Sequence, residues 1–273
     1  MATGDSPLFR EQAGGTIMTE ADEIQRRWAR VVGFSYLFAL APAVFAEFYV
    51  SGRLVSDNAI VTAQNIIAHE RIFRLGIASN LLVFATDVVL VTALYIVLER
   101  VNRRLALLAT FFRLIETSIL IVAVLNDFYV LRLLSGASYL TTLNSDELAA
   151  LARVSMGAHG SAYNVALIFF GCGSPVFCYL WFRSGYIPKP LAAWGLLASV
   201  WIGICAFTFV VFPELTKVIT VVYYGGPIFF FELSMGFWLL FKGIRQHTLT
   251  SDQREQQRDE TRHAAKERSH ADP

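Results

Sequence analysis

The sequence predicts an all-α polytopic membrane protein, a bundle of six transmembrane helices. Hydrophobic residues make up 55% of the 273 positions and charged residues only 16%, whereas a soluble domain is usually about a quarter charged. The apolar residues also form long continuous runs, and the charges crowd into the short stretches between them. Such runs are typical of membrane helices, because the strands of membrane barrels alternate apolar and polar residues instead.

Six runs have the roughly 20 apolar residues that a spanning helix needs. They lie at about 29–50, 75–98, 105–125, 157–182, 192–212 and 219–241. The first run starts too deep in the chain for a signal peptide and is itself long enough to span. We therefore expect one transmembrane domain at 21–245, between a disordered N-terminal tail at 1–20 and a charged tail at 246–273.

The distribution of lysine and arginine predicts the orientation in the membrane. Sixteen of the 23 lie in the N-terminal region, the turns at 99–104 and 183–191, and the C-terminal tail. Six lie in the connections on the other side, and the last is Arg113, inside the third run. Because cytoplasmic connections carry the excess of positive charge, both termini are expected in the cytoplasm of a cell-membrane protein.

Four ionisable residues fall near the middle of predicted spans: Asp87, Arg113, Glu116 and Glu232. Each costs about 2.5–3.5 kcal/mol to insert at that depth. They are tolerable only if they face one another or a wet cavity, so the second, third and sixth spans are expected to meet there. Three carboxyls meet one guanidinium, so two acids are held neutral, or a cation is bound, or water enters.

The short 99–104 turn predicts that the second and third spans are antiparallel neighbours. Counted from that turn, Asp87 and Arg113 differ in depth by only about 4–5 Å. We therefore expect a direct Arg113–Asp87 contact, with Glu116 and Glu232 beside it.

A second polar layer is expected nearer the outer surface. If the helix before the second span is continuous, His69, Asn80 and Asp87 form one stripe, because their spacings are close to whole turns. A separate short amphipathic helix is expected at 144–159, opened by a good capping sequence. The layer comprises Glu47, His69, Glu70, Arg74, Asn80, His159, Tyr163 and Asn164.

Standard catalytic and metal-binding signatures are missing from the sequence. It has no HExxH, no GxSxG, no phosphate-binding glycine loop and no clustered His/Cys set. Neither a cofactor nor a metal is therefore predicted. A net charge of +1 gives no basis for nucleic-acid binding.

The stretch at 65–117 resembles the core of a family of bacterial six-span integral membrane proteins classed as a domain of unknown function. The pattern comprises Asn65, Glu70, Phe73 to Gly76, Asp87, Asn102-Arg103, Phe112-Arg113 and Glu116. His159-Gly160, Phe169 to Gly171 and the segment 183–191 also fit, over roughly 22–243, and the chain departs at Cys172 to Pro175. The resemblance implies a six-helix membrane protein and supplies no activity.

Three functions remain open from the residues. The first is transport or binding of a small solute or a lipid from the bilayer, by an outward-facing polar site. The second is an intramembrane enzyme that uses a protonated carboxyl as a general acid on a lipid or isoprenoid. The third is a scaffold whose charges only fix the helix register. Since no inverted repeat is visible, a homodimer would have to supply the symmetry common in transporters.

Overall fold

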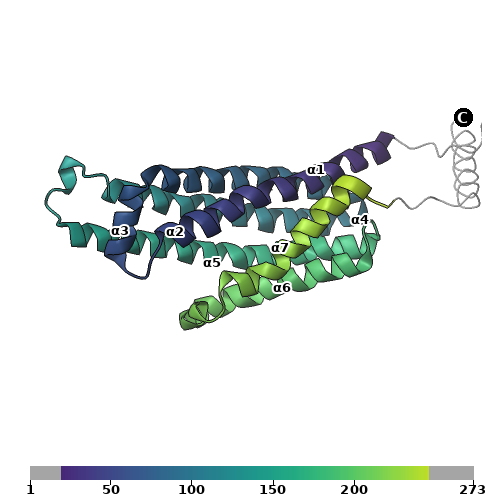
Figure 1. Cartoon of the computed structure of the whole chain (residues 1–273). Coiled ribbons are helices and arrows are strands. Elements are labelled where there is room, and N and C mark those ends of the chain that lie inside the picture. Colours follow the sequence, from purple (N-terminus) through teal and green to yellow (C-terminus); the bar gives the residue numbers. More distant parts are fainter. Residues whose placement is uncertain (1–19, 246–273) are drawn as a thin grey trace, which may run out of the picture.

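The computed structural model describes residues 20–245, and every regular element in that range is a helix (Figure 1). Five helices are long and apolar enough to cross a membrane. One of them, α4, folds back on itself and supplies two spans, so the six predicted spans are all present. Of the two predicted tails, only Glu20, where α1 begins, lies within the described residues.

The elements follow one another with short connections. They are α1 (Glu20–Val44), the π-helical η2 (Phe45–Ser51), α2 (Gly52–Leu54), α3 (Ala59–Ala68), α4 (Glu70–Leu133), η3 (Ser138–Leu140), α5 (Ser145–Ser184), α6 (Lys189–Val211), η4 (Pro213–Lys217), α7 (Val221–Phe237) and the π-helical η5 (Trp238–Lys242).

Helix α4 is a hairpin whose bend lies at Asn102. A straight helix of 64 residues would be about 96 Å long, but Asn102 has extended dihedrals (φ −161°, ψ 102°) that reverse the chain. The Asn102 side chain accepts a hydrogen bond from the backbone N–H of Leu105 at 3.1 Å. This bond caps the second arm, so one residue both ends the first arm and starts the next.

Both described ends of the chain lie at the same end of the bundle, here called the terminal end (Figure 1). The side-chain amide of Gln25, in α1, donates to the Val97 carbonyl at 2.8 Å. Arg100 pairs with Asp22 at 3.1 Å. These contacts tie α1 to the α4 bend. Placement of this end in the cytoplasm remains a prediction from the lysine and arginine distribution.

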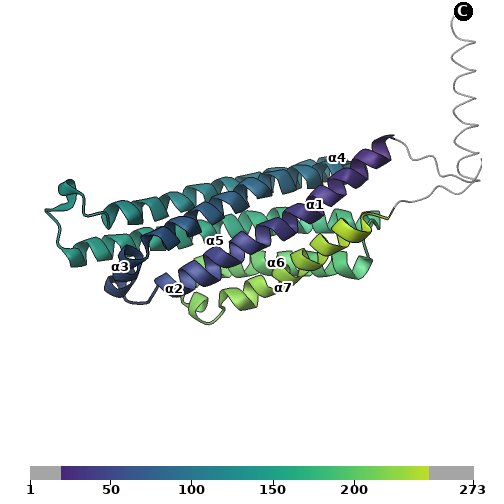
Figure 2. The same cartoon turned by 45° about the horizontal axis from the view of Figure 1, so that its top comes forward.

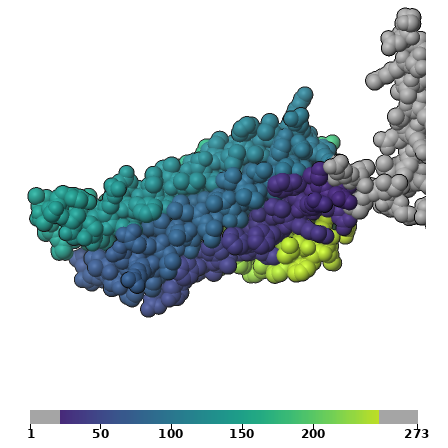
Figure 3. Space-filling model, turned by 90° about the horizontal axis from the view of Figure 1, so that it is seen from above, coloured from purple at the N-terminus to yellow at the C-terminus, as the bar shows by residue number. Residues whose placement is uncertain are grey.

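At the opposite, distal end, α4 and α5 extend beyond α6 and α7 (Figure 1). The tip that α4 and α5 form there is the teal end of the molecule in Figure 3. The separate amphipathic helix expected at 144–159 was a wrong prediction, because α5 runs unbroken from Ser145 to Ser184. The expected capping chemistry is present, since Asn144 and Glu147 form a reciprocal capping box. With 40 residues, α5 is about 60 Å long, twice the roughly 30 Å of a bilayer core.

Small residues allow α5 and α6 to pack with their backbones in contact. A Cβ added at Gly171 would lie 2.4 Å from the Gly203 Cα. At Gly195 an added Cβ would lie 2.4 Å from the Phe231 ring, which joins α6 to α7. Close backbone approach at small residues is a main source of attraction between helices in lipid.

Gly171→Ala is expected to lower the free energy of unfolding by about 1–3 kcal/mol, because its Cβ would overlap backbone atoms that cannot rotate away. Gly157→Ala is the matched control, since an added Cβ there meets no atom within 4 Å and alanine favours the helix. Thermal unfolding in detergent measures both. Equal melting temperatures for the two variants would contradict the close α5–α6 packing.

The first half of α7 lies beside α6 but has no fully buried side chain (Figure 2). The buried residues of this helix are Phe231, Met235 and Gly236, all in its second half, which packs against α1. Residues 221–230 are half-buried or exposed. The distal part of α7 lines the central cavity of the bundle.

Candidate functional site

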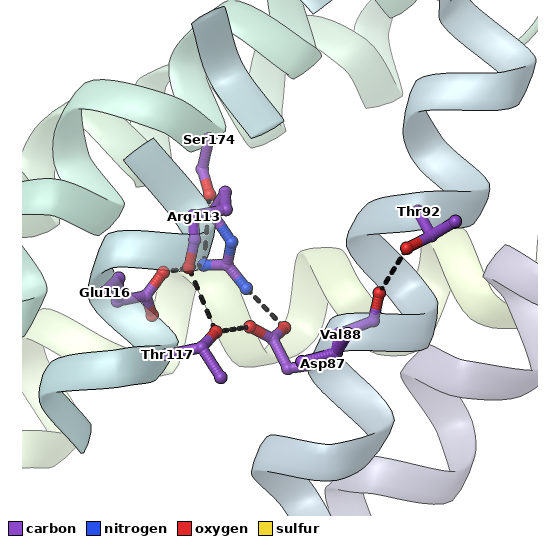
Figure 4. Close-up of polar contacts among 7 residues, drawn as sticks. All are labelled: Asp87, Val88, Thr92, Arg113, Glu116, Thr117 and Ser174. Atoms are coloured by element: carbon purple, nitrogen blue, oxygen red, sulfur yellow. Dashed lines mark hydrogen bonds and ion pairs between the residues drawn. The ribbon is translucent and has the colours of Figure 1, made fainter. Parts of the chain in front are cut away.

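An ion cluster joins the two arms of α4 at the centre of the bundle (Figure 4). The Arg113 guanidinium donates from Nη2 to Asp87 Oδ1 at 2.6 Å, and its Nη1 lies 2.8 Å from Glu116 Oε2. The predicted contact between Arg113 and Asp87 is therefore confirmed. Only 7% of the Arg113 side chain, 14% of Asp87 and 6% of Glu116 is exposed.

Neutral groups complete this cluster. The Thr117 hydroxyl donates to Asp87 Oδ2 at 2.6 Å, so both carboxylate oxygens of Asp87 are satisfied. Ser174, from α5, accepts from Arg113 Nη1 at 3.3 Å. The guanidinium carbon also lies 4.6 Å from the centre of the Phe170 ring, within the range of a cation–π contact. The predicted cluster did not include Thr117, Ser174 or Phe170.

The cluster opens into a cavity of about 670 Å³. All four predicted central residues line it: Asp87, Arg113, Glu116 and Glu232. So do five members of the predicted outer layer: Glu47, Asn80, His159, Tyr163 and Asn164. The cavity therefore runs from the ion cluster to the η4 loop at the distal end, where Thr216 also lines it.

The walls of the cavity are half apolar. Polar side chains reach it from every spanning helix except α6, whereas α6 contributes only Ile202 and Phe209. The rings of Tyr36, Tyr163 and Tyr224 also line it, from α1, α5 and α7. A volume of this size is typical of small-molecule sites.

Glu232 and Glu47 line the cavity without forming an ion pair. Neither carboxyl has an ion pair or a hydrogen bond with any residue in 20–245. Glu232 was expected beside the Arg113–Asp87 contact, and it lines the same cavity as those two residues without pairing with Arg113.

An ion pair that the sequence analysis missed lies on the distal side of the cavity. His159 Nδ1 lies 3.1 Å from Asp127 Oδ1, and only 13% of the Asp127 side chain is exposed. The third span was predicted to end near residue 125, which placed Asp127 in a loop. The second arm of α4 instead continues to Leu133, so Asp127 faces α5 from within a helix.

Three predicted residues of the outer layer do not reach the cavity. The continuous stripe through His69 was a wrong prediction, because His69 has non-helical dihedrals (φ −127°, ψ 38°) and separates α3 from α4. Its Nδ1 lies 3.1 Å from the Asn65 carbonyl instead. Glu70 and Arg74 pair on the exposed surface at 2.7 Å.

The part of the chain that the structure describes contains no group of three or more His, Cys, Asp or Glu residues able to hold a metal. The prediction that no cofactor is bound stays a prediction. The three cysteines are free thiols, and Cys178 lies 4.0 Å from the Ser199 hydroxyl in a buried position.

A bundle of spanning helices around a charged cavity defines this chain as a multi-pass helical membrane protein. Residues 31–243 match the family described as Domain of unknown function (DUF4386), and the chain belongs to that family. This match confirms the family resemblance seen in the sequence. No curated protein and no solved structure matches the chain.

Proposed function

We propose that this protein binds a small organic cation with an apolar body in the central cavity, as a carrier or receptor for such solutes. One observation carries the proposal: four carboxyls line the cavity, and two of them, Glu232 and Glu47, have no ion-pair partner within residues 20–245. The cationic side chains that line it are Arg113 and, when protonated, His159. Carboxyls therefore exceed cations by two.

The shape and walls of the cavity support the same ligand class. The apolar half of the lining can cover a hydrocarbon or aromatic body, which would otherwise be exposed to water. Tyr36, Tyr163 and Tyr224 offer ring faces, which attract organic cations. Glu232 lies deep in the cavity, so the positive charge would enter first and the body would follow.

A scaffold function is less well supported by this geometry. A purely structural cluster needs its charges paired and its surroundings filled, since an unpaired buried charge is destabilising. Asp87 and Glu116 meet that description, because both contact Arg113. Glu232, with a carboxyl that faces about 670 Å³ of space, does not.

Ligand-induced stabilisation tests the proposal directly. Purified protein in detergent is heated with tetraphenylphosphonium, with the anion tetraphenylborate, and with neutral triphenylmethane. We expect only the cation to raise the melting temperature, by an amount that grows with its concentration. Its affinity should rise with pH, because a proton and an organic cation compete for the same carboxyl.

The controls separate binding from partition into detergent. Equal stabilisation by the cation and the neutral compound would contradict the proposal, and so would no stabilisation by any alkyl or aryl cation. Uptake of the bound cation into proteoliposomes would identify a carrier. Binding without uptake would identify a receptor.

A further inference from the structure

A second pocket lies at the distal end of α4 and shares no lining residue with the central cavity. It is a groove of about 430 Å³ between the two arms of the hairpin. The residues that line it are Arg74 from the first arm and Leu125, Phe128, Tyr129, Leu131, Arg132 and Ser135 from the second arm and its end.

The groove straddles the boundary between apolar and polar surface. Leu125 is 50% exposed and Tyr129 54% exposed, and Leu75, next to Arg74, is 56% exposed. Exposed apolar side chains of this kind belong in lipid, whereas the two exposed arginines need water or headgroups. Arg74 precedes Asp87 by 13 residues, about 20 Å of helix. If Asp87 lies near the bilayer centre, Arg74 lies at headgroup depth.

The two arginines lie at similar heights and lean toward each other. They are 28 residues before and 30 residues after Asn102, so their heights above the bend differ by about 3 Å. Side chains on a helix point toward its N-terminus. Because the arms are antiparallel, Arg74 leans toward the distal end and Arg132 leans back toward the membrane.

The groove carries one unmatched positive charge. Arg74 donates from Nε to Glu70 at 2.7 Å, which leaves its terminal N–H groups unused by any residue in 20–245. The Arg132 side chain has no ion pair or hydrogen bond within the same range. With Glu70 counted, the local sum is one positive charge, which matches one phosphodiester.

We infer that this groove is a binding site for one anionic phospholipid of the phosphatidylglycerol type. Its phosphate is bridged by the guanidinium groups of Arg74 and Arg132, which suit phosphate oxygens by geometry and charge. An acyl chain lies along Leu125 and Phe128 on the membrane side. A zwitterionic lipid fits less well, because its ammonium group would sit beside two arginines.

Lipid titration followed by native mass spectrometry tests this site. Delipidated protein is mixed with phosphatidylglycerol or phosphatidylethanolamine of the same acyl chains. We expect phosphatidylglycerol to bind more tightly, and Arg132→Gln to weaken that binding about fivefold, equivalent to about 1 kcal/mol. Arg132→Lys should recover part of the loss. Arg153→Gln is the matched control, because Arg153 is exposed on α5 and does not line the groove.

Three results would overturn the inference. These are equal affinity for the two lipids, an equal loss in Arg153→Gln, and displacement of the lipid by millimolar inorganic phosphate. The last result would show that a free anion, rather than a lipid, occupies the groove. Arg132 is exposed, so folding of the variants is expected to be unaffected.

Discussion

Arg113→Leu is expected to lower the free energy of unfolding by about 3–5 kcal/mol, because it leaves two buried carboxyls without their counter-charge. The effect should appear as a large drop in melting temperature in detergent. Arg153→Leu, which removes an exposed arginine, should change the melting temperature little.

A rescue experiment tests whether charge imbalance causes the loss of stability in Arg113→Leu. In the triple variant Arg113→Leu, Asp87→Asn, Glu116→Gln, the uncompensated charges are removed together with the arginine. Stability should recover by a large part of the loss, since a charge cluster replaced as a whole is often tolerated. If the triple variant is as unstable as Arg113→Leu alone, the cause is lost packing against Phe170 rather than lost charge balance.

Glu232→Gln is expected to lose ligand binding and to keep its stability, unlike Arg113→Leu. A charge-assisted contact contributes about 1.5–3 kcal/mol, so the affinity for tetraphenylphosphonium should fall about ten- to hundredfold. The melting temperature without ligand should stay within a few degrees, because Glu232 has no ion-pair partner in the described chain.

Glu214→Gln is the matched control for this variant, since Glu214 is an exposed acid in η4 that does not line the cavity. Unchanged affinity in Glu232→Gln would remove Glu232 from the site. If Glu47→Gln then lost binding, the ligand's charge would lie at the distal end of the cavity.

The sequence was sufficient to predict the spans and the central cluster, for one physical reason. A long apolar run identifies a helix that spans the lipid. An isolated charge within such a run, such as Arg113, must find an anion at its own depth, which identifies its neighbours. The short turn at 99–104 then made Asp87 the cross-helix partner by counting alone.

The missed features carry no such energetic signal. Thr117 and Ser174 cost little free energy to insert in a membrane helix, so their presence there does not indicate a site. Their role depends on the direction in which each side chain points. Asp127 was missed because α4 and α5 continue beyond the apolar runs. Hydropathy does not show how far a helix extends outside the bilayer. The break at His69 separates two segments that are each good helix formers, and tertiary packing decides it.

The one-residue bend at Asn102 also has a consequence for biosynthesis. Asp87 leaves the ribosome 26 residues before Arg113. The first arm alone would carry the uncompensated Asp87 charge into lipid at a cost of about 2.5–3.5 kcal/mol. The tight bend brings the second arm alongside the first as soon as it is made, and the pair can neutralise each other within the translocation machinery. The two arms are therefore expected to leave that machinery for the bilayer together, as a single hairpin.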